Sequence, residues 1–304
     1  MKNPTVGKHE AEDLKKIVEK VIKGLGNPKP PLDLRDVREL LKLDVRYYSS
    51  TNDSFLQETI SRMKIAGKQI IKRPSLLLDV VKKAKLSALW IPDHKRILID
   101  ESTPKLKHRW FEGHEIGHGL APWHKLFLFG DNQETLGQGC HEQLEAEANF
   151  AAGQLLFLQD RFVIEGNDNQ ANMKTVLQLS EVFGNTKTST LWRFVEECHE
   201  DKFLVGVISQ HPHHPKNDFD ALAPIKHLVE SPGFKEQFGN INVFNLFASI
   251  KKYCSRNKGG PLGTAMIRLL DVNGDAHDFR FESFSNSYEC LTLGVYVRKV
   301  GIIF

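Results

Sequence analysis

Apolar residues recur along the chain at two spacings, one typical of helices and one typical of strands. Helical spacing predicts helices over 9–23, from Asp33 to Leu41, over 54–86 with a break at Pro74, 104–120, 142–158, 176–183 and 188–197, and near 218–230 and 242–255. Short apolar runs predict strands over 45–48, 89–91, 96–99, 203–209, 266–270, 278–284 and 290–297. Together these elements predict an α+β fold.

Two changes in the pattern divide the chain into three parts. Residues 167–170 form a polar break, and strands become frequent from Phe203. We expect a first domain over 1–168, a helical segment over 169–200 and a small α/β domain over 201–304. The middle segment has the proportions of a helix-turn-helix around Gly184-Asn185. Two helices joined by a glycine turn more often pack against the rest of a domain than bind the major groove of DNA. We therefore favour a packing role for this pair.

Composition narrows the class of protein. Of the 304 residues, 40% are hydrophobic and 26% are charged, which excludes a disordered or fibrous chain. No apolar run approaches the ~18 residues of a membrane span, and the first residues are too charged for a signal peptide. The four cysteines are far apart and form no CxxC, which indicates free thiols. We therefore expect a soluble cytoplasmic protein with no membrane contact.

Basic residues gather in one segment although the net charge is only +3. Eight of them meet the single acid Asp79 there: Arg62, Lys64, Lys68, Lys72, Arg73, Lys82, Lys83 and Lys85. We favour a solvated helix face, because no aromatic residues interleave for base stacking. The alternative is a surface for nucleic acid, with single-stranded DNA as a candidate activator.

The chemistry is concentrated in an HExxH motif, His114-Glu115-Ile116-Gly117-His118, inside a predicted helix. Residues four apart on a helix lie on one face, so both imidazoles can bind one Zn2+ ion. The carboxylate of Glu115 can then take a proton from a metal-bound water. This arrangement is typical of metal-assisted hydrolysis.

Two residues compete to be the third ligand. His124 has the metzincin spacing, but Ala121 replaces the glycine that turns the chain back, and Pro122 pushes Ala121 towards extended conformations. We favour Glu145 on the next predicted helix. Asn149, one turn later, could hydrogen-bond the outer nitrogen of a metal-bound histidine. Glu147 points about 200° away from Glu145 around that helix, so we expect it to be solvated.

Other polar residues near the motif have weaker assignments. Cys140 precedes Glu145 by five residues, and we favour an ordinary thiol there. The alternative is an inhibitory fourth zinc ligand that keeps the enzyme latent. Candidates for stabilising an oxyanion, by proximity in sequence alone, are His108, His124 and His141. In the loop 211–215, prolines interleave with His211, His213 and His214, which favours an extended exposed loop over a metal site.

Residues 109–118, RWFEGHEIGH, and 145–156, EAEANFAAGQLL, resemble the ImmA/IrrE metallopeptidase family, whose usual patterns are RFTxAHExxH and ExEANxFAxxLL. The likeness extends over about residues 10–197. Trp110 and Gly113 replace the usual Phe and Ala of the first pattern, and Ala151 replaces the usual Phe of the second. None of the three is a ligand position.

The resemblance implies a mostly helical, zincin-like peptidase domain with a small sheet. It implies that His114, His118 and Glu145 bind Zn2+, that Glu115 is catalytic, and that the substrate is a helix-turn-helix repressor. The C-terminal domain looks like the GAF-like domain of some members, which implies cleavage after a stress, DNA-damage or phage signal. The rival hypothesis is a DNA-binding transcriptional regulator that uses the 176–197 helix pair and holds zinc without catalysis.

Overall fold

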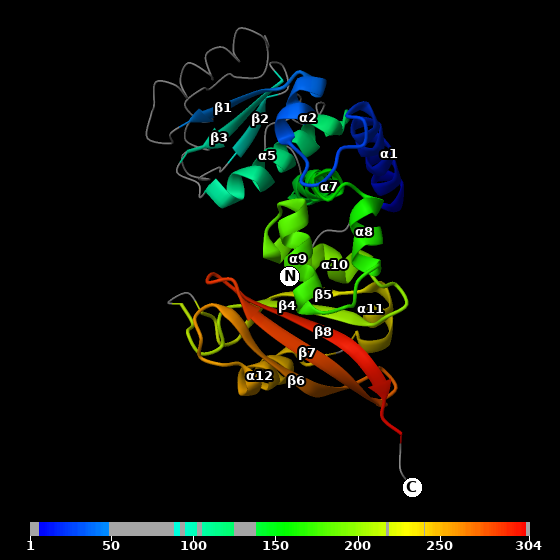
Figure 1. Ribbon diagram of the computed structural model, residues 1–304, viewed down its shortest axis with the longest axis vertical. Helices are drawn as coiled ribbons and strands as arrows, with labels where there is room; N and C mark the ends of the chain where they lie inside the picture. Colours follow the sequence, from blue (N-terminus) through cyan, green and yellow to red (C-terminus); the bar gives the residue numbers. More distant parts are fainter. Residues whose placement is uncertain are drawn as a thin grey trace. The chain divides into compact units, whose positions relative to one another are not determined.

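The computed structural model describes residues 6–48, 88–91, 95–101, 105–124, 138–216, 219–239 and 241–301. The chain forms two compact units, Met1–Gln159 and Asp160–Phe304. Each contains helices and a sheet, so the predicted α+β class is confirmed (Figure 1). The predicted helix pair belongs to the second unit, together with the C-terminal sheet. Among the described helices, none has the length and apolar character of a membrane span.

The first unit combines four described helices with a three-stranded sheet. In chain order its elements are α1 (Lys8–Gly24), α2 (Leu34–Leu41), β1 (Asp44–Tyr48), β2 (Ala88–Ile91), β3 (Arg96–Asp100), α5 (Lys105–Leu120) and α7 (Gln138–Leu156). The strand order is β1-β3-β2, with β1 parallel and β2 antiparallel to β3. The Asp33 side chain caps α2 by accepting from the backbone N–H of Arg35. The predicted helix from Asp33 to Leu41 and the predicted strands at 89–91 and 96–99 are therefore confirmed.

Helices α5 and α7 approach each other closely where α5 carries Gly117. A Cβ atom on Gly117 would lie only 2.4 Å from the backbone oxygen of Ala148. Glycine on one helix and alanine on the other allow this approach, and Ile116 and Leu155 are buried beside it. The contact places the HExxH face of α5 against the acidic residues of α7.

The second unit is built on a five-stranded antiparallel sheet of order β5-β4-β8-β7-β6. Its helices are α8 (Asp160–Asn167), α9 (Met173–Phe183), α10 (Lys187–Glu197), α11 (Pro232–Phe238) and α12 (Val243–Tyr253). Its strands are β4 (Leu204–Ser209), β5 (Ile225–Glu230), β6 (Gly260–Leu270), β7 (Ala276–Ser285) and β8 (Cys290–Lys299). The Asn273-Gly274 turn joins β6 to β7, and Gly274 has a φ of 84°, a conformation that glycine adopts readily in tight hairpin turns.

Helices cover both faces of this sheet (Figure 1). Val205 and Val207 share a core with Phe234 of α11 and Leu246 of α12. Gly206 points the other way, as alternation in a strand requires, and lies against Leu191 and Val195 of α10. The sheet is therefore the middle layer of the unit.

The predicted helix near 218–230 is wrong. Residues 225–230 form β5, which pairs with β4 at the edge of the sheet, and the helix begins only at Pro232. The Ser231 side chain caps that helix by accepting from the backbone N–H of Phe234. Pairing with a strand distant along the chain decided this segment, and local spacing does not report such pairing.

The predicted turn between α9 and α10 is present, with Gly184 in the left-handed conformation at a φ of 64°. Of the residues of α10, only Glu196 is exposed, because the helix packs on the sheet. This burial agrees with the packing role that we favoured for the pair. The expected division into parts 1–168, 169–200 and 201–304, and the GAF-like character of the last, stay predictions.

Candidate metal centre

Three side chains from α5 and α7 converge on one point. His114 and His118 lie one turn apart on α5, with their Nε2 atoms 3.2 Å apart. Glu145 of α7 faces both, at 3.2 Å from His114 Nε2 and 3.4 Å from His118 Nε2. Within the described part of the chain, this is the one group of at least three His, Cys, Asp or Glu side chains that could hold a metal ion.

These separations fit a tetrahedral zinc ion. Zinc binds nitrogen and oxygen at about 2.0–2.2 Å, so two ligand atoms at the tetrahedral angle lie about 3.3 Å apart. The three observed separations, 3.2, 3.2 and 3.4 Å, bracket that value. Two imidazoles and one carboxylate are also the donor set of many catalytic zinc sites, which leave the fourth position open.

The charges at the site favour metal binding. Burial opposes ionisation of Glu145, but hydrogen bonds from His114 and His118 outweigh it and lower the pKa of the carboxyl group. Burial likewise opposes protonation of His114, yet contact with Glu145 and the nearby charge of Glu115 raise its pKa. A metal ion that binds such a group takes the place of its proton, so an ionised Glu145 is a suitable ligand. The side chain of Glu145 is 42% exposed, so the site is open to solvent.

Glu115 lies between the two histidines in sequence and is buried, with 6% of its surface exposed. Its charge contributes to the raised pKa of His114, its neighbour in the chain. The structure therefore groups the three expected ligands His114, His118 and Glu145, with the buried Glu115 next to the first of them in the sequence.

Asn149 lies one helical turn after Glu145. Its Oδ1 atom is 2.9 Å from Nδ1 of His114, the ring nitrogen that faces away from the site. This is the contact that the sequence predicted for Asn149.

A second network, which the sequence analysis missed, lies behind His118. Nδ1 of His118 is 3.0 Å from Nδ1 of His124, and Nε2 of His124 is 3.0 Å from the Glu147 carboxylate. Trp123 and Gln143 also donate to that carboxylate, at 2.5 and 2.8 Å.

One expectation about this network is corrected, and the preference for Glu145 over His124 as third ligand agrees with the structure. Glu147 is only 3% exposed and is not solvated, because α7 is enclosed on several sides and three donors surround the carboxylate. His124 is fully buried and both its ring nitrogens have partners, so it lies behind the ligands and not among them. Two features of the sequence could have indicated this network. Gln143 lies four residues before Glu147 on the same helix, and Trp123 and His124 follow the HExxH motif closely.

Other predicted site residues contribute less. Cys140 and His141 lie in the first turn of α7, and their side chains fall outside the described part of the structure, as does the whole basic segment from Arg62 to Lys85. The His108 ring packs against Tyr47 with centroids 5.5 Å apart. His108 is therefore not one of the three grouped ligands.

The histidine loop of the second unit is only partly exposed as expected, because His214 and Pro215 are exposed and His211 and Pro212 are buried. His211 is buried, and its Nε2 lies 2.8 Å from the carbonyl oxygen of Asn257. His213 and His214 bond the carbonyl oxygens of Cys254 and Arg256 in the same way. Each of the three rings therefore donates one hydrogen bond to a backbone carbonyl of the segment after α12.

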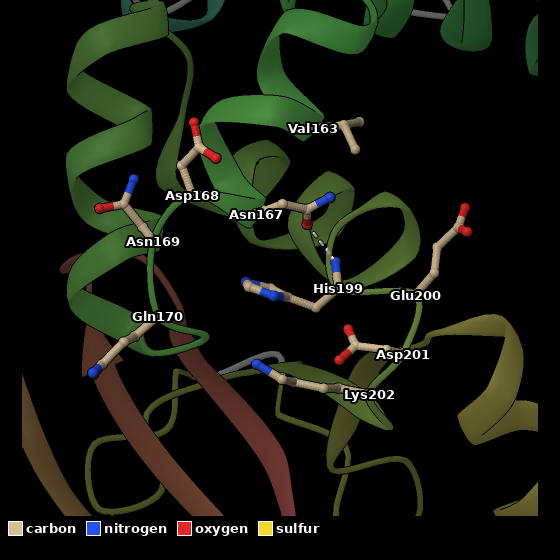
Figure 2. A pocket seen from close by; sticks show the side chains of 9 residues that line it. All are labelled: Val163, Asn167, Asp168, Asn169, Gln170, His199, Glu200, Asp201 and Lys202. Carbon is tan, nitrogen blue, oxygen red and sulfur yellow. Dashed lines mark hydrogen bonds between the residues drawn. The ribbon is translucent and has the colours of Figure 1, made fainter.

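The second unit also contains an open pocket of about 730 Å³. The lining residues are mostly polar: Val163, Asn167, Asp168, Asn169, Gln170, His199, Glu200, Asp201 and Lys202. Figure 2 shows how the Asn167 side chain accepts from the backbone N–H of His199, at 2.7 Å, and so ties the end of α8 to the segment after α10. The pocket is a candidate place for a small polar ligand in this unit.

Comparison with known proteins gives a fold likeness and no family. No protein-family model and no curated protein sequence matches the chain. A solved structure of a Mycobacterium tuberculosis transcriptional regulator is similar, with a TM-score of 0.53 and 10% identity. The alignment covers 94% of this chain and 76% of that one. At this identity the likeness concerns the fold alone.

Proposed function

We propose that the protein is a zinc-dependent endopeptidase. The observation that carries the proposal is the group of His114, His118 and Glu145, with ligand atoms 3.2–3.4 Å apart, together with the buried Glu115 that follows His114 in the chain. A zinc ion held there would acidify a bound water and polarise a peptide carbonyl. The resemblance of both helices to the ImmA/IrrE patterns supports the same reaction.

The residues of the chain have distinct tasks in this reaction. His114, His118 and Glu145 hold the metal, and Asn149 orients the His114 ring through Nδ1. Glu115 accepts the proton of the attacking water and then donates it to the amine that leaves when the peptide bond breaks.

The proposed substrate is a helix-turn-helix repressor. Its support is the family resemblance, in which peptidases of this kind cleave such repressors. A sensing role for the second unit is part of the same proposal, with the pocket around His199 as the place where an inducing ligand could bind.

Glu115→Gln tests the reaction, because glutamine preserves shape but cannot accept the proton. We expect the variant to keep one zinc per chain and its fold, and to lose about 10²–10⁴-fold in cleavage rate. The assay is intact-mass analysis of the co-incubated repressor, with and without a chelator. Glu142→Gln, at an exposed position on α7, is the matched control and should cleave normally. Turnover by Glu115→Gln at the control rate would refute the hydrolytic mechanism.

A second candidate is a transcriptional regulator with a structural metal. The likeness to a transcriptional regulator favours it. The burial of α10 counts against DNA reading by that helix, since only Glu196 is exposed. Sequence-specific DNA binding that Glu115→Gln leaves intact, in a protein that cleaves no repressor, would favour this candidate over the peptidase.

A further inference from the structure

We propose that His124 and Glu147 are positioning residues for the metal site. In this inference they form, with His118, a hydrogen-bonded chain that holds the His118 ring in the tautomer and orientation required for metal binding. The inference rests on the metal site of the proposed function. It concerns how one ligand is oriented, and it does not depend on which bond is cleaved.

The direction of the hydrogen bonds follows from the geometry. Nε2 of His118 faces His114 and Glu145, so this nitrogen must carry the lone pair that binds a metal. A neutral imidazole has one N–H, which must then be on Nδ1 of His118. That N–H points at Nδ1 of His124, 3.0 Å away, which therefore has to be an acceptor.

The same reasoning extends one step further. If Nδ1 of His124 accepts, the proton of that ring is on Nε2, where it donates to the Glu147 carboxylate at 3.0 Å. An ionised carboxylate accepts hydrogen bonds and cannot donate them. The hydrogen bonds therefore all run in one direction, from His118 through His124 to Glu147. Each link fixes the tautomer of the ring before it.

Glu147 is itself held in place. Its two oxygens accept from Trp123 Nε1 at 2.5 Å and Gln143 Nε2 at 2.8 Å, as well as from His124. With His124 fully buried and Glu147 3% exposed, water does not compete for these bonds.

The two histidine ligands are therefore supported differently. The outer nitrogen of His114 has the neutral amide oxygen of Asn149, an exposed residue. The outer nitrogen of His118 has a buried imidazole that ends on a carboxylate. Because the imidazole that accepts from His118 is buried and is itself held by a charged carboxylate, whereas Asn149 is an exposed neutral amide, His118 is the more firmly oriented ligand.

The test is zinc affinity, measured by competition with a chromophoric chelator on the full chain. Glu147→Gln keeps the shape but removes the charge, and we expect it to weaken zinc binding about 10–100-fold. The matched control is Glu112→Gln on α5, which removes another buried carboxylate, paired with Arg38 at 3.1 Å and unconnected to His118. Both variants should lower the melting temperature of the metal-free protein, but only Glu147→Gln should weaken zinc binding.

Variants of His124 give a graded check. His124→Asn can still offer an oxygen near the position of Nδ1, so it should retain more zinc affinity than His124→Leu, which offers no acceptor. Zinc affinity of Glu147→Gln and His124→Leu equal to that of the unmutated chain would overturn the inference.

A measurement on the unmutated chain guards against variants that do not fold. Long-range 1H–15N spectra of the zinc-loaded protein should show His118 protonated on Nδ1 and His124 on Nε2. A proton on Nδ1 of His124 would overturn the inference while leaving the metal site in place. Weakened zinc binding by Glu147→Gln in a protein that cleaves nothing would support the inference and count against the peptidase.

Discussion

Gly117 offers a sharp test of how the two motifs are brought together, because its substitution by alanine adds one methyl group at the contact between α5 and α7. The new Cβ would lie 2.4 Å from the backbone oxygen of Ala148, whereas ordinary contact begins at 3.4 Å. The helices would have to separate by about 1 Å, since a backbone oxygen cannot rotate away. Metal sites tolerate deviations of only about 0.2 Å in ligand distance, so Glu145 would be moved out of range of the histidines.

The energy has two opposing parts. Overpacking costs about 1–3 kcal/mol, and contact with rigid backbone belongs at the upper end of that range. Replacing glycine in a helix recovers about 1 kcal/mol of intrinsic propensity. We therefore expect Gly117→Ala to lower the free energy of unfolding by about 2 kcal/mol and to weaken zinc binding by at least about tenfold.

Gly113→Ala is the matched control on the same helix. Its Cβ would meet Leu156 Cδ1 at 2.8 Å, the far end of a flexible side chain that can move at a cost of about 0.5–1.5 kcal/mol. The propensity gain offsets this cost, so both stability and zinc affinity should be nearly unchanged. Denaturant unfolding and chelator competition measure the two quantities. Equal behaviour of Gly117→Ala and Gly113→Ala would refute the claim that the close helix contact sets the ligand geometry.

Two further predictions concern the third ligand and the second unit. Glu145→Ala should abolish the binding of one zinc ion per chain, as measured by elemental analysis. Asn149→Ala removes only the hydrogen bond to His114 Nδ1 and should keep one weakly held zinc ion. Equal zinc retention by both variants would mean that Glu145 is not a ligand. Burial opposes ionisation of Asp271, but hydrogen bonds led by those from the Asp275 backbone and the Gln237 amide lower its pKa from 3.8 to about 2. The ionised form therefore stabilises the fold above pH 3.8, and this contribution is lost as the pH falls towards 2. In thermal melts, Asp271→Asn should be less stable than the unmutated chain near neutral pH, with the difference shrinking over that acidic window; a difference independent of pH would contradict this reasoning.

The ligand set was predictable from the sequence because its logic is local. The i,i+4 spacing places His114 and His118 on one helix face, and Asn149 follows Glu145 by the same interval. The contact between the two helices is a tertiary feature that local spacing does not report. The resemblance to a family in which both motifs contribute ligands implied that contact. The structure then placed the expected ligand atoms within 4.8 Å of one another.

The predictions that failed depended on surroundings that no local pattern reports. Glu147 was assigned to solvent on the assumption that α7 has one buried face, yet Ala146, Glu147 and Ala148 are buried in succession, so the helix is enclosed. The segment 225–230 is a strand and not the predicted helix because it pairs with β4. That strand lies before the histidine loop, so the local spacing of residues 218–230 does not report the pairing. In both cases the deciding contact comes from a segment distant along the chain.

The small residues between the ligands explain why the two motifs depend on each other. Gly117 and Ala148 let the backbones approach, and this proximity is what brings Glu145 to the histidines on α5. The same approach places Glu147 where it meets His124 at the far side of His118. One close helix contact thus positions a ligand on one side of the His118 ring and its supporting chain on the other. A substitution that separates the helices should disturb both, whereas Glu147→Gln should disturb only the second, and comparison of the two variants separates ligand placement from ligand orientation.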